Sequence, residues 1–404
     1  MRDDTKDGSR IQCAIKELGM LFMALLLFGS AGCHTTRNAF YPLGIYSVPT
    51  TNDLATVRKA GFNLVTGPAS APFLNAARAL GLRVLASPQT SAGPDFNASL
   101  ARQAVRRWDA HPALWAWYLI DEPDLNRVPP ADVLNAHRFL KNLGARKPTA
   151  LVLYQGYRAL DYARHSDILM IDRYPIPWLP LANFPQHVRM ARLAVGQEKP
   201  LIAVLQAFDW TAYPDLLPEE KNLRPPTSAE LRAMTYCALA QRANGLFFYC
   251  LNDGKWNVTE HPDTWEALKQ VVAEVNRRLP LFQAEHIWWP YLHQFKDPRT
   301  RFNAALESSV SPTLLRVRRG NEFVPVGDYV RAVNTPPSTQ VYRFYLPQPL
   351  SGTIPVLGEE RSRQIEDNWI EDEFEPFAVH VYGPLPQEHK PQRSTPAKRG
   401  NQRR

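Results

Sequence analysis

The chain has 404 residues, of which 45% are hydrophobic and 11% aromatic, and its formal net charge is +8. This composition excludes a disordered or collagen-like chain, and the length exceeds that of one small domain. The excess charge is concentrated in residues 386–404, which contain six Lys or Arg side chains and one Glu. This segment has no apolar periodicity, so we expect a disordered basic tail on a nearly neutral folded body, and no nucleic-acid partner.

Residues 1–33 have the pattern of an export signal. An apolar run, 18–28, is followed by the small residues 29–32 and then by Cys33. The run suits the apolar region of a signal peptide and is short for a membrane span. Small residues before a cysteine resemble a bacterial lipoprotein cleavage site, which predicts that Cys33 is lipidated and holds the protein at a membrane of the cell envelope. Ser30 stands where that motif has an aliphatic residue, so an ordinary secretory signal is the alternative.

Two cysteines follow the leader. Cys237 lies in a helical pattern, and Cys250 lies in the apolar run that comes next. An oxidising compartment would allow the two to form a disulfide. The other interpretation is a pair of separate buried thiols that act as small hydrophobic residues.

Short apolar runs alternate with amphipathic stretches eight times between residues 41 and 279. The predicted strands are 43–48, 62–66, 83–87, 114–120, 149–154, 168–172, 201–206 and 245–251. The predicted helices are 52–60, 71–80, 97–110, 130–143, 157–165, 185–195, 228–242 and 262–279. Strands without a polar face are typical of a parallel sheet that is covered on both sides. Eight such units predict an α/β fold, a (β/α)8 TIM barrel over residues 41–280.

The alternative to the barrel is an open, doubly wound sheet. Such a sheet would need a Gly-rich phosphate-binding turn after its first strand. The residues from Ile45 to Pro49 contain no glycine, and this favours the barrel.

The pattern changes after residue 279. Short β-branched or aromatic runs are separated there by turn clusters rich in Pro, Ser and Asn. The runs are 304–308, 314–318, 329–332, 340–346, 352–357 and 377–382. They predict a small C-terminal antiparallel β-sandwich over residues 285–385.

The segment from His111 to Asp124 carries the strongest functional signal. The predicted strand 114–120 is followed by Asp121 and Glu122, and Pro123 ends it because proline cannot donate to a sheet ladder. Two acids at the end of an apolar strand are costly to desolvate unless they have a partner or a function. In a parallel barrel this end of the strands holds the catalytic groups. The structural alternative is a helix N-terminus that is capped by Asp124.

The other strand ends supply acids, amides and aromatic rings, but no Ser elbow, catalytic Cys or cluster at metal-ligand spacing. We therefore expect no cofactor and no metal. Aromatic rings stack on sugar faces, while amides and acids bind hydroxyl groups, so an oligosaccharide or polysaccharide is the predicted substrate. The predicted binding residues are Tyr46, Gln89, Tyr154, Tyr174, Trp178, Gln206, Trp210, Tyr249, Asn252, Asp253 and Trp256.

The run from Trp117 to Pro123 resembles the strand-four motif of the clan A glycoside hydrolases. Asp121 stands at the position of the motif's Asn, and Glu122 stands at the position of its acid/base Glu. The resemblance extends from residue 41 to about residue 382 and implies a glycosidase. The chain departs from the family at strand seven, which ends in Gln206 where the family has its nucleophilic Glu.

Three explanations of this departure stay open. The second acid comes from elsewhere, with Asp172 as the first candidate and Asp253 or Asp209 behind it. Alternatively, the substrate supplies its own nucleophile, which Asp172 orients. In the third, the protein binds glycans without cleaving them.

We predict an exported glycoside hydrolase. Glu122 is its general acid, with a pKa raised by the Asp121 charge and the apolar strand. Asp172 is the second carboxylate, and Asp121 orients Glu122 or a sugar hydroxyl. We expect Gln206, Tyr174 and Asn252 to bind sugar hydroxyl groups. We expect Trp178, Trp210 and Trp256 to stack on sugar rings. The alternatives are a non-catalytic glycan-binding surface lipoprotein and a cell-wall scaffold, and the structural interpretation of Asp172 and Arg173 is an ion pair.

Overall fold

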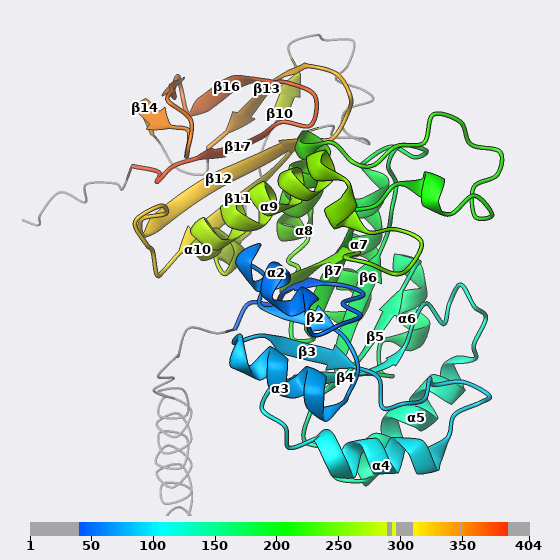
Figure 1. The fold of residues 1–404 in the computed structure, drawn as a ribbon. Coiled ribbons are helices and arrows are strands. Elements are labelled where there is room, and N and C mark those ends of the chain that lie inside the picture. Colours follow the sequence, from blue (N-terminus) through cyan, green and yellow to red (C-terminus); the bar gives the residue numbers. More distant parts are fainter. Residues whose placement is uncertain (1–39, 289–292, 296–309, 347–349, 387–404) are drawn as a thin grey trace, which may run out of the picture. The chain divides into compact units, whose positions relative to one another are not determined.

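The computed structural model describes residues 40–288, 293–295, 310–346 and 350–386 (Figure 1). The predicted leader with Cys33, the predicted strand 304–308 and the basic tail beyond residue 386 lie outside these residues. Among the described residues, no helix has both the length and the hydropathy that a membrane span needs.

Eight parallel strands form a closed barrel in chain order, which confirms the predicted fold class (Figure 1). Strands β5, β6 and β7 are buried at every position, as expected for a parallel sheet covered by helices. The strands are β1 (Leu43–Ile45), β2 (Leu64–Thr66), β3 (Arg83–Ala86), β4 (Leu114–Ile120), β5 (Thr149–Leu153), β6 (Ile168–Asp172), β7 (Leu201–Gln206) and β8 (Gly245–Tyr249).

Helices cover the barrel and begin where the sequence supplies caps. Thr227 and Glu230 form a capping box at the start of α8, and Asn97 caps α4 through its side chain. The helices are α2 (Asp53–Lys59), α3 (Ala71–Ala79), α4 (Ala98–Trp108), α5 (Pro130–Asn142), α6 (Ala159–Tyr162), α7 (Asn183–Val195), α8 (Ser228–Ala240), α9 (Pro262–Arg277) and α10 (Leu279–Phe282).

The helix that was predicted over residues 157–165 is wrong in its extent. The structure has a 3-10 turn, Gly156–Arg158, and then the single turn of α6. Gly156 packs directly against α7, so that a Cβ there would lie 1.9 Å from the carbonyl oxygen of His187. The His187 ring also accepts a hydrogen bond from the Gly156 N–H at 2.9 Å. This tertiary contact fixes the segment in a conformation that helix periodicity does not reveal.

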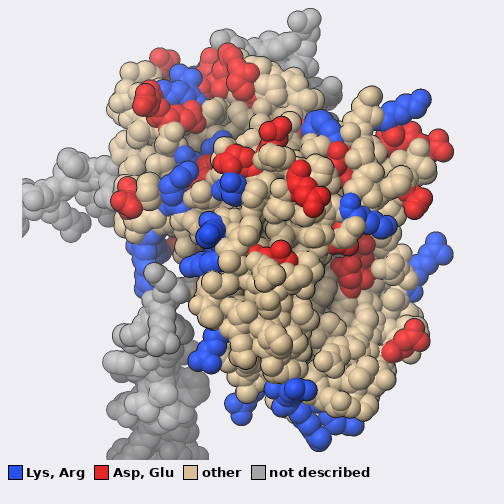
Figure 2. All heavy atoms as spheres, in the orientation of Figure 1, with Lys and Arg blue, Asp and Glu red and all other residues tan. Residues whose placement is uncertain are grey.

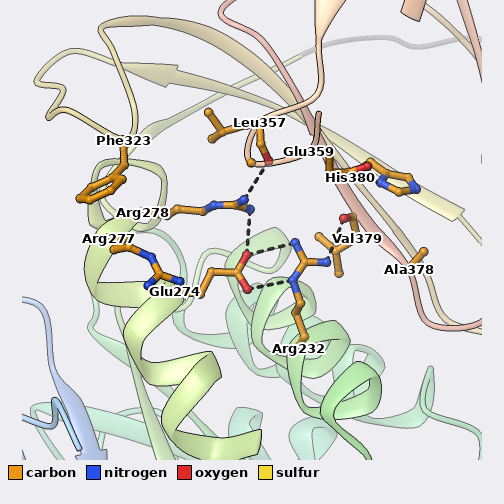
Figure 3. Close-up of a pocket in the computed structure, with 11 residues that line it drawn as sticks. Arg232, Glu274, Arg277, Arg278, Phe323, Leu357, Glu359, Ala378, Val379 and His380 are labelled. Carbon is orange, nitrogen blue, oxygen red and sulfur yellow. Dashed lines mark hydrogen bonds and ion pairs between the residues drawn. The ribbon is translucent and has the colours of Figure 1, made fainter. Parts of the chain in front are cut away.

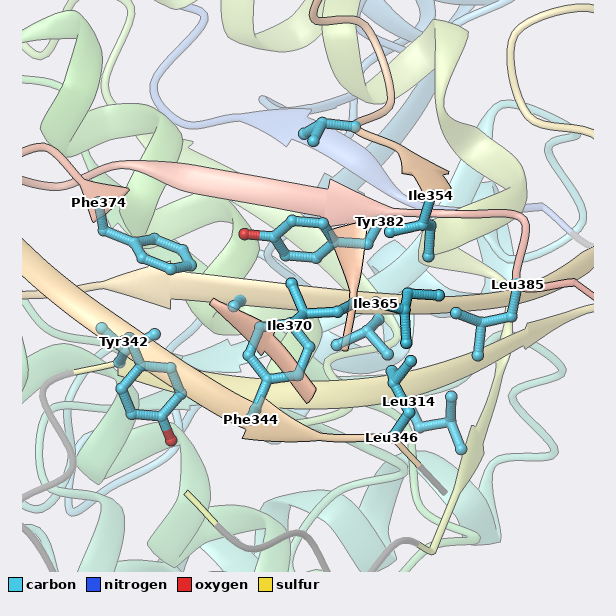
Figure 4. Packing of buried hydrophobic residues seen from close by; sticks show 14 residues of the cluster. Leu314, Tyr342, Phe344, Leu346, Ile354, Ile365, Ile370, Phe374, Tyr382 and Leu385 are labelled. Atoms are coloured by element: carbon cyan, nitrogen blue, oxygen red, sulfur yellow. The ribbon is translucent and has the colours of Figure 1, made fainter. Parts of the chain in front are cut away.

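A C-terminal β-sandwich follows the barrel, as predicted. Its four-stranded sheet has the order β17-β12-β11-β9, its three-stranded sheet the order β10-β13-β16, and β14 pairs with β15. Tyr342, Phe344, Ile370 and Tyr382 contribute to its apolar core (Figure 4). The strands are β9 (Glu285–Ile287), β10 (His293–Phe295), β11 (Val310–Val317), β12 (Gly327–Asn334), β13 (Gln340–Tyr345), β14 (Gly352–Pro355), β15 (Ser362–Ile365), β16 (Trp369–Phe374) and β17 (Val379–Tyr382).

Four of these strands, β9, β10, β15 and β16, were not predicted. In β16 the inward positions include Asp372, a buried acid that interrupts the apolar alternation. Arg361, Arg363 and the Tyr382 hydroxyl donate to this carboxylate, which explains how the fold tolerates it.

Arginine side chains connect α8 and α9 to the C-terminal strands. Glu274 of α9 accepts two bonds from Arg232, and Arg278 pairs with the same carboxylate at 2.8 Å. The two guanidinium groups also donate to the carbonyl oxygens of Val379 and Leu357 (Figure 3). A pocket of about 580 Å³ lies among these residues. Burial opposes ionisation of Glu274, but the bonds from Arg232 leave its pKa below the usual range.

The two cysteines are buried and free. This outcome agrees with the interpretation of Cys237 and Cys250 as separate hydrophobic thiols.

Candidate active site

The end of β4 is set by a register shift in its pairing with β5. Tyr118 lies opposite Ala150, whereas Ile120 lies opposite Leu151, so one extra residue is inserted between them. Such a bulge changes the direction in which the following side chains point. Beside this irregularity, the Tyr118 hydroxyl donates a hydrogen bond to the Asp121 carboxylate.

Trp117 fixes the same strand from the outer side. Its indole N–H donates to Asp109 Oδ1 at 2.9 Å, at the end of α4. Asp109 also accepts the backbone N–H groups of Arg146 and Lys147, which precede β5. The strand that presents the acids is therefore held rigidly on its helix-facing side.

Glu122 has a backbone φ of 40°, in the left-handed region that side chains other than glycine rarely adopt. Such a conformation costs on the order of 1–3 kcal/mol and is found mainly at functional sites. The next acid, Asp124, accepts the N–H groups of Tyr154 and Gln155 at 3.1 and 2.7 Å. Asp124 thus connects this turn to the end of β5 and caps no helix, which rules out the structural alternative for the segment.

Glu122 and Asp172 lie close enough that the charge of Glu122 helps to raise the pKa of Asp172. Asp172, at the end of β6, is 5% exposed, and its Oδ2 accepts the Tyr174 hydroxyl at 3.2 Å. Within the described part of the chain, Asp172 Oδ1 accepts no bond from a conventional donor. Ionised Glu122 and ionised Asp172 would repel each other, which favours a proton on one of the two carboxyl groups.

Burial raises the pKa of both carboxyl groups in this pair. The pKa of Glu122 rises to about 7, with added contributions from the charges of Asp121 and Asp124. The pKa of Asp172 lies well above its usual range because of burial first and the Glu122 charge second. Near neutral pH the pair therefore holds at least one proton.

Figure 2 shows acidic side chains gathered in a hollow close to the position of β6 in Figure 1. Asp121 is more exposed than Glu122 and Asp172. Surrounding protein atoms raise its pKa by desolvation, and the bond from Tyr118 lowers it in part. Tyr46, directly after β1, donates in turn to the Tyr118 hydroxyl at 3.3 Å. The structure thus brings the three predicted catalytic residues together, with tyrosine donors beneath them.

Aromatic rings from the ends of β6, β7 and β8 form one interlocked cluster. Phe208 lies 4.9 Å from Trp210, 5.1 Å from Tyr174 and 5.6 Å from Tyr249 between ring centroids. Most contacts are edge-to-face, which is the favoured geometry for aromatic pairs. Trp210 is only 7% exposed, so most of its ring packs against protein.

The predicted sugar-stacking residues differ in how open they are. Trp256 is 4% exposed, and its ring is stacked on His261 at a centroid distance of 3.7 Å. This placement does not fit a stacking role for Trp256, because the protein already covers the ring. Trp178 is half-buried and retains exposed ring surface beside Tyr154 and Arg173.

Gln206 has no exposed surface at all. Its amide oxygen accepts the Ile176 N–H at 2.9 Å, and its amide nitrogen donates to the carbonyl oxygens of Ile176 and Phe208. The amide oxygen and nitrogen of Gln206 are therefore already used in hydrogen bonds that hold the loop after β6. The predicted role of binding sugar hydroxyls does not fit this position, and we correct it to positioning of the loop.

After β8, Asp253 is held by hydrogen bonds within the protein, whereas Asn252 lines a pocket. Asp253 accepts the hydroxyls of Tyr213 and Tyr249 at 2.7 and 2.9 Å, and burial does not prevent these bonds from lowering its pKa. Asp253 is thus fully used and unsuited to be the second acid. Asn252 lines a pocket of about 480 Å³ together with Ser47 and Thr66, and the acids of β4 and β6 lie outside this lining.

Gln89 and Asp209 lie apart from the predicted catalytic acids. Gln89 is exposed after β3, with a φ of 65°, and it makes no hydrogen bond to the acids in the described chain. Asp209 accepts the Thr211 N–H at 2.8 Å and begins a short 3-10 turn. Neither residue joins the carboxyl pair.

Tyr118 and Arg173 belong to the site but were not among the predicted site residues. The signal for Tyr118 was its place in the same strand, three residues before Asp121, but the bulge beside them has no sequence signature. Arg173 forms no ion pair with Asp172 in the described chain, so the ion-pair interpretation is not what the structure shows. No group of three or more His, Cys, Asp or Glu among the described residues is arranged to hold a metal ion.

Replacing Tyr118 with Phe is expected to lower turnover about tenfold while leaving the melting temperature nearly unchanged. The hydroxyl stabilises ionised Asp121 and contributes little to packing, because the ring remains. Steady-state kinetics and thermal melting of the purified variant would measure both effects. Unchanged kinetics would show that Asp121 needs no orientation by this hydroxyl.

Comparisons with known proteins bear on the fold. No protein-family model matches the chain, and no curated protein sequence does. Among solved structures, a family 27 β-L-arabinopyranosidase from Geobacillus stearothermophilus is 12% identical, with 86% of this chain and 97% of that chain covered and a TM-score of 0.54. The fold is that of the barrel glycoside hydrolases.

Two other solved structures agree. A family 5 glycoside hydrolase from Bacteroides vulgatus is 9% identical over 85% of this chain and 89% of its own, with a TM-score of 0.52. An α-amylase from Anoxybacillus is 10% identical over 83% and 90%, with a TM-score of 0.51. The resemblance predicted from the strand-four motif is therefore confirmed at the level of the fold.

Proposed function

We propose that this protein is a glycoside hydrolase that cleaves O-glycosidic bonds with Glu122 as general acid. The observation that carries the proposal is the placement of Glu122 and Asp172 at the carboxyl ends of β4 and β6, where burial raises the pKa of Glu122 to about 7. An acid with a pKa near the working pH donates its proton most effectively. The fold of the barrel glycoside hydrolases supports the same reaction class.

In this mechanism Glu122 gives its proton to the glycosidic oxygen as the bond to the anomeric carbon breaks. Asp172 is the second carboxylate and stabilises the positive charge that develops on the sugar ring. Water then adds to the anomeric carbon and gives up a proton to the carboxylate of Glu122, which completes the hydrolysis. The separation of the two carboxyl groups in the substrate complex decides the outcome, with roughly 5–5.5 Å for retention and about 6.5–9.5 Å for inversion.

Asp121 orients the substrate or Glu122. Its carboxylate is held by the Tyr118 hydroxyl, so it reaches the substrate in a fixed direction. We assign ring contacts to half-buried Tyr154 and Trp178, because the more deeply buried Trp210 and Trp256 leave little ring surface for a sugar.

The first test is a screen of the purified full chain against a panel of neutral and acidic oligosaccharides and polysaccharides. Released products are measured by chromatography for the wild type and for Glu122→Gln. Release by the wild type alone supports hydrolysis. Saturable binding of a glycan without any release would instead favour the glycan-binding alternative and overturn the enzymatic proposal.

Export and a lipid at Cys33 are part of the proposal and rest on the leader pattern. Mass spectrometry of membrane-extracted protein is expected to find a mature chain that begins at lipidated Cys33. An unmodified N-terminus beyond Cys33 would leave ordinary secretion as the explanation.

A further inference from the structure

Arg173 places a positive charge in a site that is otherwise acidic. It follows Asp172 directly at the end of β6, and Asp121, Glu122 and Asp124 lie on the neighbouring turn after β4. Its charge acts on Glu122, because it opposes the burial-driven rise in the pKa of that carboxyl group. A cation so placed would ordinarily be expected to form an ion pair with one of the acids.

No such ion pair forms within the described part of the chain. The guanidinium instead lies over the Tyr154 ring, 4.3 Å from its centroid, and 6.0 Å from that of Trp178. The Nε–H group donates to Asn183 Oδ1 at 2.5 Å, and the Arg173 charge opposes the burial-driven rise in the pKa of Tyr154. These contacts fix the plane of the guanidinium without neutralising its charge.

A structural arginine in this protein is bonded differently. Arg192, which is buried, donates four bonds to the carbonyl oxygens of Gly196, Lys199 and Arg242 and to Asn244. Arg173 has five N–H donors, like any arginine, and its hydrogen bond within the described residues is the one that Nε–H donates to Asn183. Arg173 is only half-buried, so part of the residue remains exposed to solvent.

A planar guanidinium with free donors matches a carboxylate, which it binds through two parallel hydrogen bonds. The adjacent faces of Tyr154 and Trp178 suit a sugar ring that carries such a group. We propose that the site recognises a carboxylate-bearing sugar, a hexuronic acid residue, through the guanidinium of Arg173. This inference rests on the proposed function, since it assumes that the mouth of the barrel binds carbohydrate.

The test measures binding, so that it does not depend on cleavage. The full chain with Glu122→Gln is titrated calorimetrically with oligomers of galacturonic, glucuronic and mannuronic acid. Each oligomer is compared with the neutral galactose, glucose or mannose oligomer of the same length and linkage. We expect at least one uronate to bind about tenfold or more tightly than its neutral counterpart.

Substitutions of Arg173 identify the group responsible. Arg173→Gln is expected to reduce that preference to about twofold or less, and Arg173→Lys to retain only part of it, because lysine keeps the charge but loses the planar fork. Arg189→Gln is the matched control: Arg189 is exposed on α7 and should leave every affinity unchanged. Thermal melting confirms that each variant is folded. If Arg173→Gln does not fold, the loss of preference is measured with Arg173→Lys instead.

Three results would overturn the inference: no uronate preference in any pair, a preference that survives in Arg173→Gln, or tighter binding of a sulfated galactose oligomer than of every uronate. The outcome is separable from that of the proposed function. Uronate preference without any hydrolysis by the wild type would remove the enzymatic proposal and keep the Arg173 assignment. Hydrolysis of neutral oligosaccharides without uronate preference would keep the enzymatic proposal and remove the Arg173 assignment.

Discussion

Replacing Glu122 with Gln is expected to lower turnover by a factor on the order of 10² or more, with substrate binding retained. The amide keeps the size and hydrogen-bonding capacity of the side chain but cannot donate a proton to the glycosidic oxygen. For the wild type, turnover should fall as the pH rises above about 7, because Glu122 then loses the proton that it must donate. Steady-state kinetics across the pH range measure both effects.

Glu122→Gln is expected to lower turnover but to raise stability, and the gain in stability depends on pH. The pKa of Glu122 rises from 4.5 to about 7 in the folded chain, so the folded state binds this proton more tightly than the unfolded state. Its contribution to stability is present in acid and is lost as the pH rises through the folded-state value. Glu122→Gln should therefore melt at a higher temperature than the wild type above neutral pH, with the difference shrinking in acid.

A matched control separates this effect from a general effect of removing a charge. Glu198 is exposed in the segment before β7, and Glu198→Gln should change neither turnover nor the pH dependence of melting. Full activity in Glu122→Gln would end the assignment of Glu122 as the acid. A lower melting temperature for Glu122→Gln at every pH would show that Glu122 is a structural residue.

The barrel was predictable because its strands are apolar over their whole length. Strands β4, β6 and β7 have the predicted bounds, and most helices end within a few residues of them. The C-terminal strands were harder to predict, since partners distant in sequence form them and Asp372 occupies an inward position in β16. The buried Asp372 is stabilised by Arg361, just before β15, and by Arg363 in β15, which a local pattern does not show.

The candidate site was predictable in its membership and less so in its orientations. The ends of β4 and β6 supply the three acids as predicted, because parallel strands in a barrel end at the same face. The sequence did not show that a bulge lies beside the bond from Tyr118 to Asp121, or that Trp256 is stacked on His261. Local patterns identify the end of a strand, but tertiary contacts decide which side chains remain open to a ligand.

Gln206 is the position where the family resemblance and the structure meet most directly. Gln206→Glu would restore the residue that the clan A glycoside hydrolases have at the end of strand seven. We expect this change to lower the free energy of unfolding by about 3–5 kcal/mol and to give no gain in hydrolysis. Urea denaturation and product release measure the two outcomes.

The reason lies in what the amide of Gln206 contacts. Its nitrogen donates to the carbonyl oxygens of Ile176 and Phe208, and a carboxylate there would present an oxygen to both without any donor. The side chain is fully buried, so water cannot compensate for the lost bonds. Protonation of the new acid would recover only one of these bonds, so destabilisation is expected to persist at acidic pH.

Gln103→Glu is the matched control for the same chemical change. Gln103 is exposed on α4, so its substitution should alter stability by no more than about 0.5 kcal/mol. A stable Gln206→Glu variant with increased hydrolysis would show that this position reaches the substrate, and Asp172 would lose its role as the second carboxylate. An unstable variant without such a gain would leave Gln206 as the residue that holds the loop after β6, and the catalytic acids on β4 and β6.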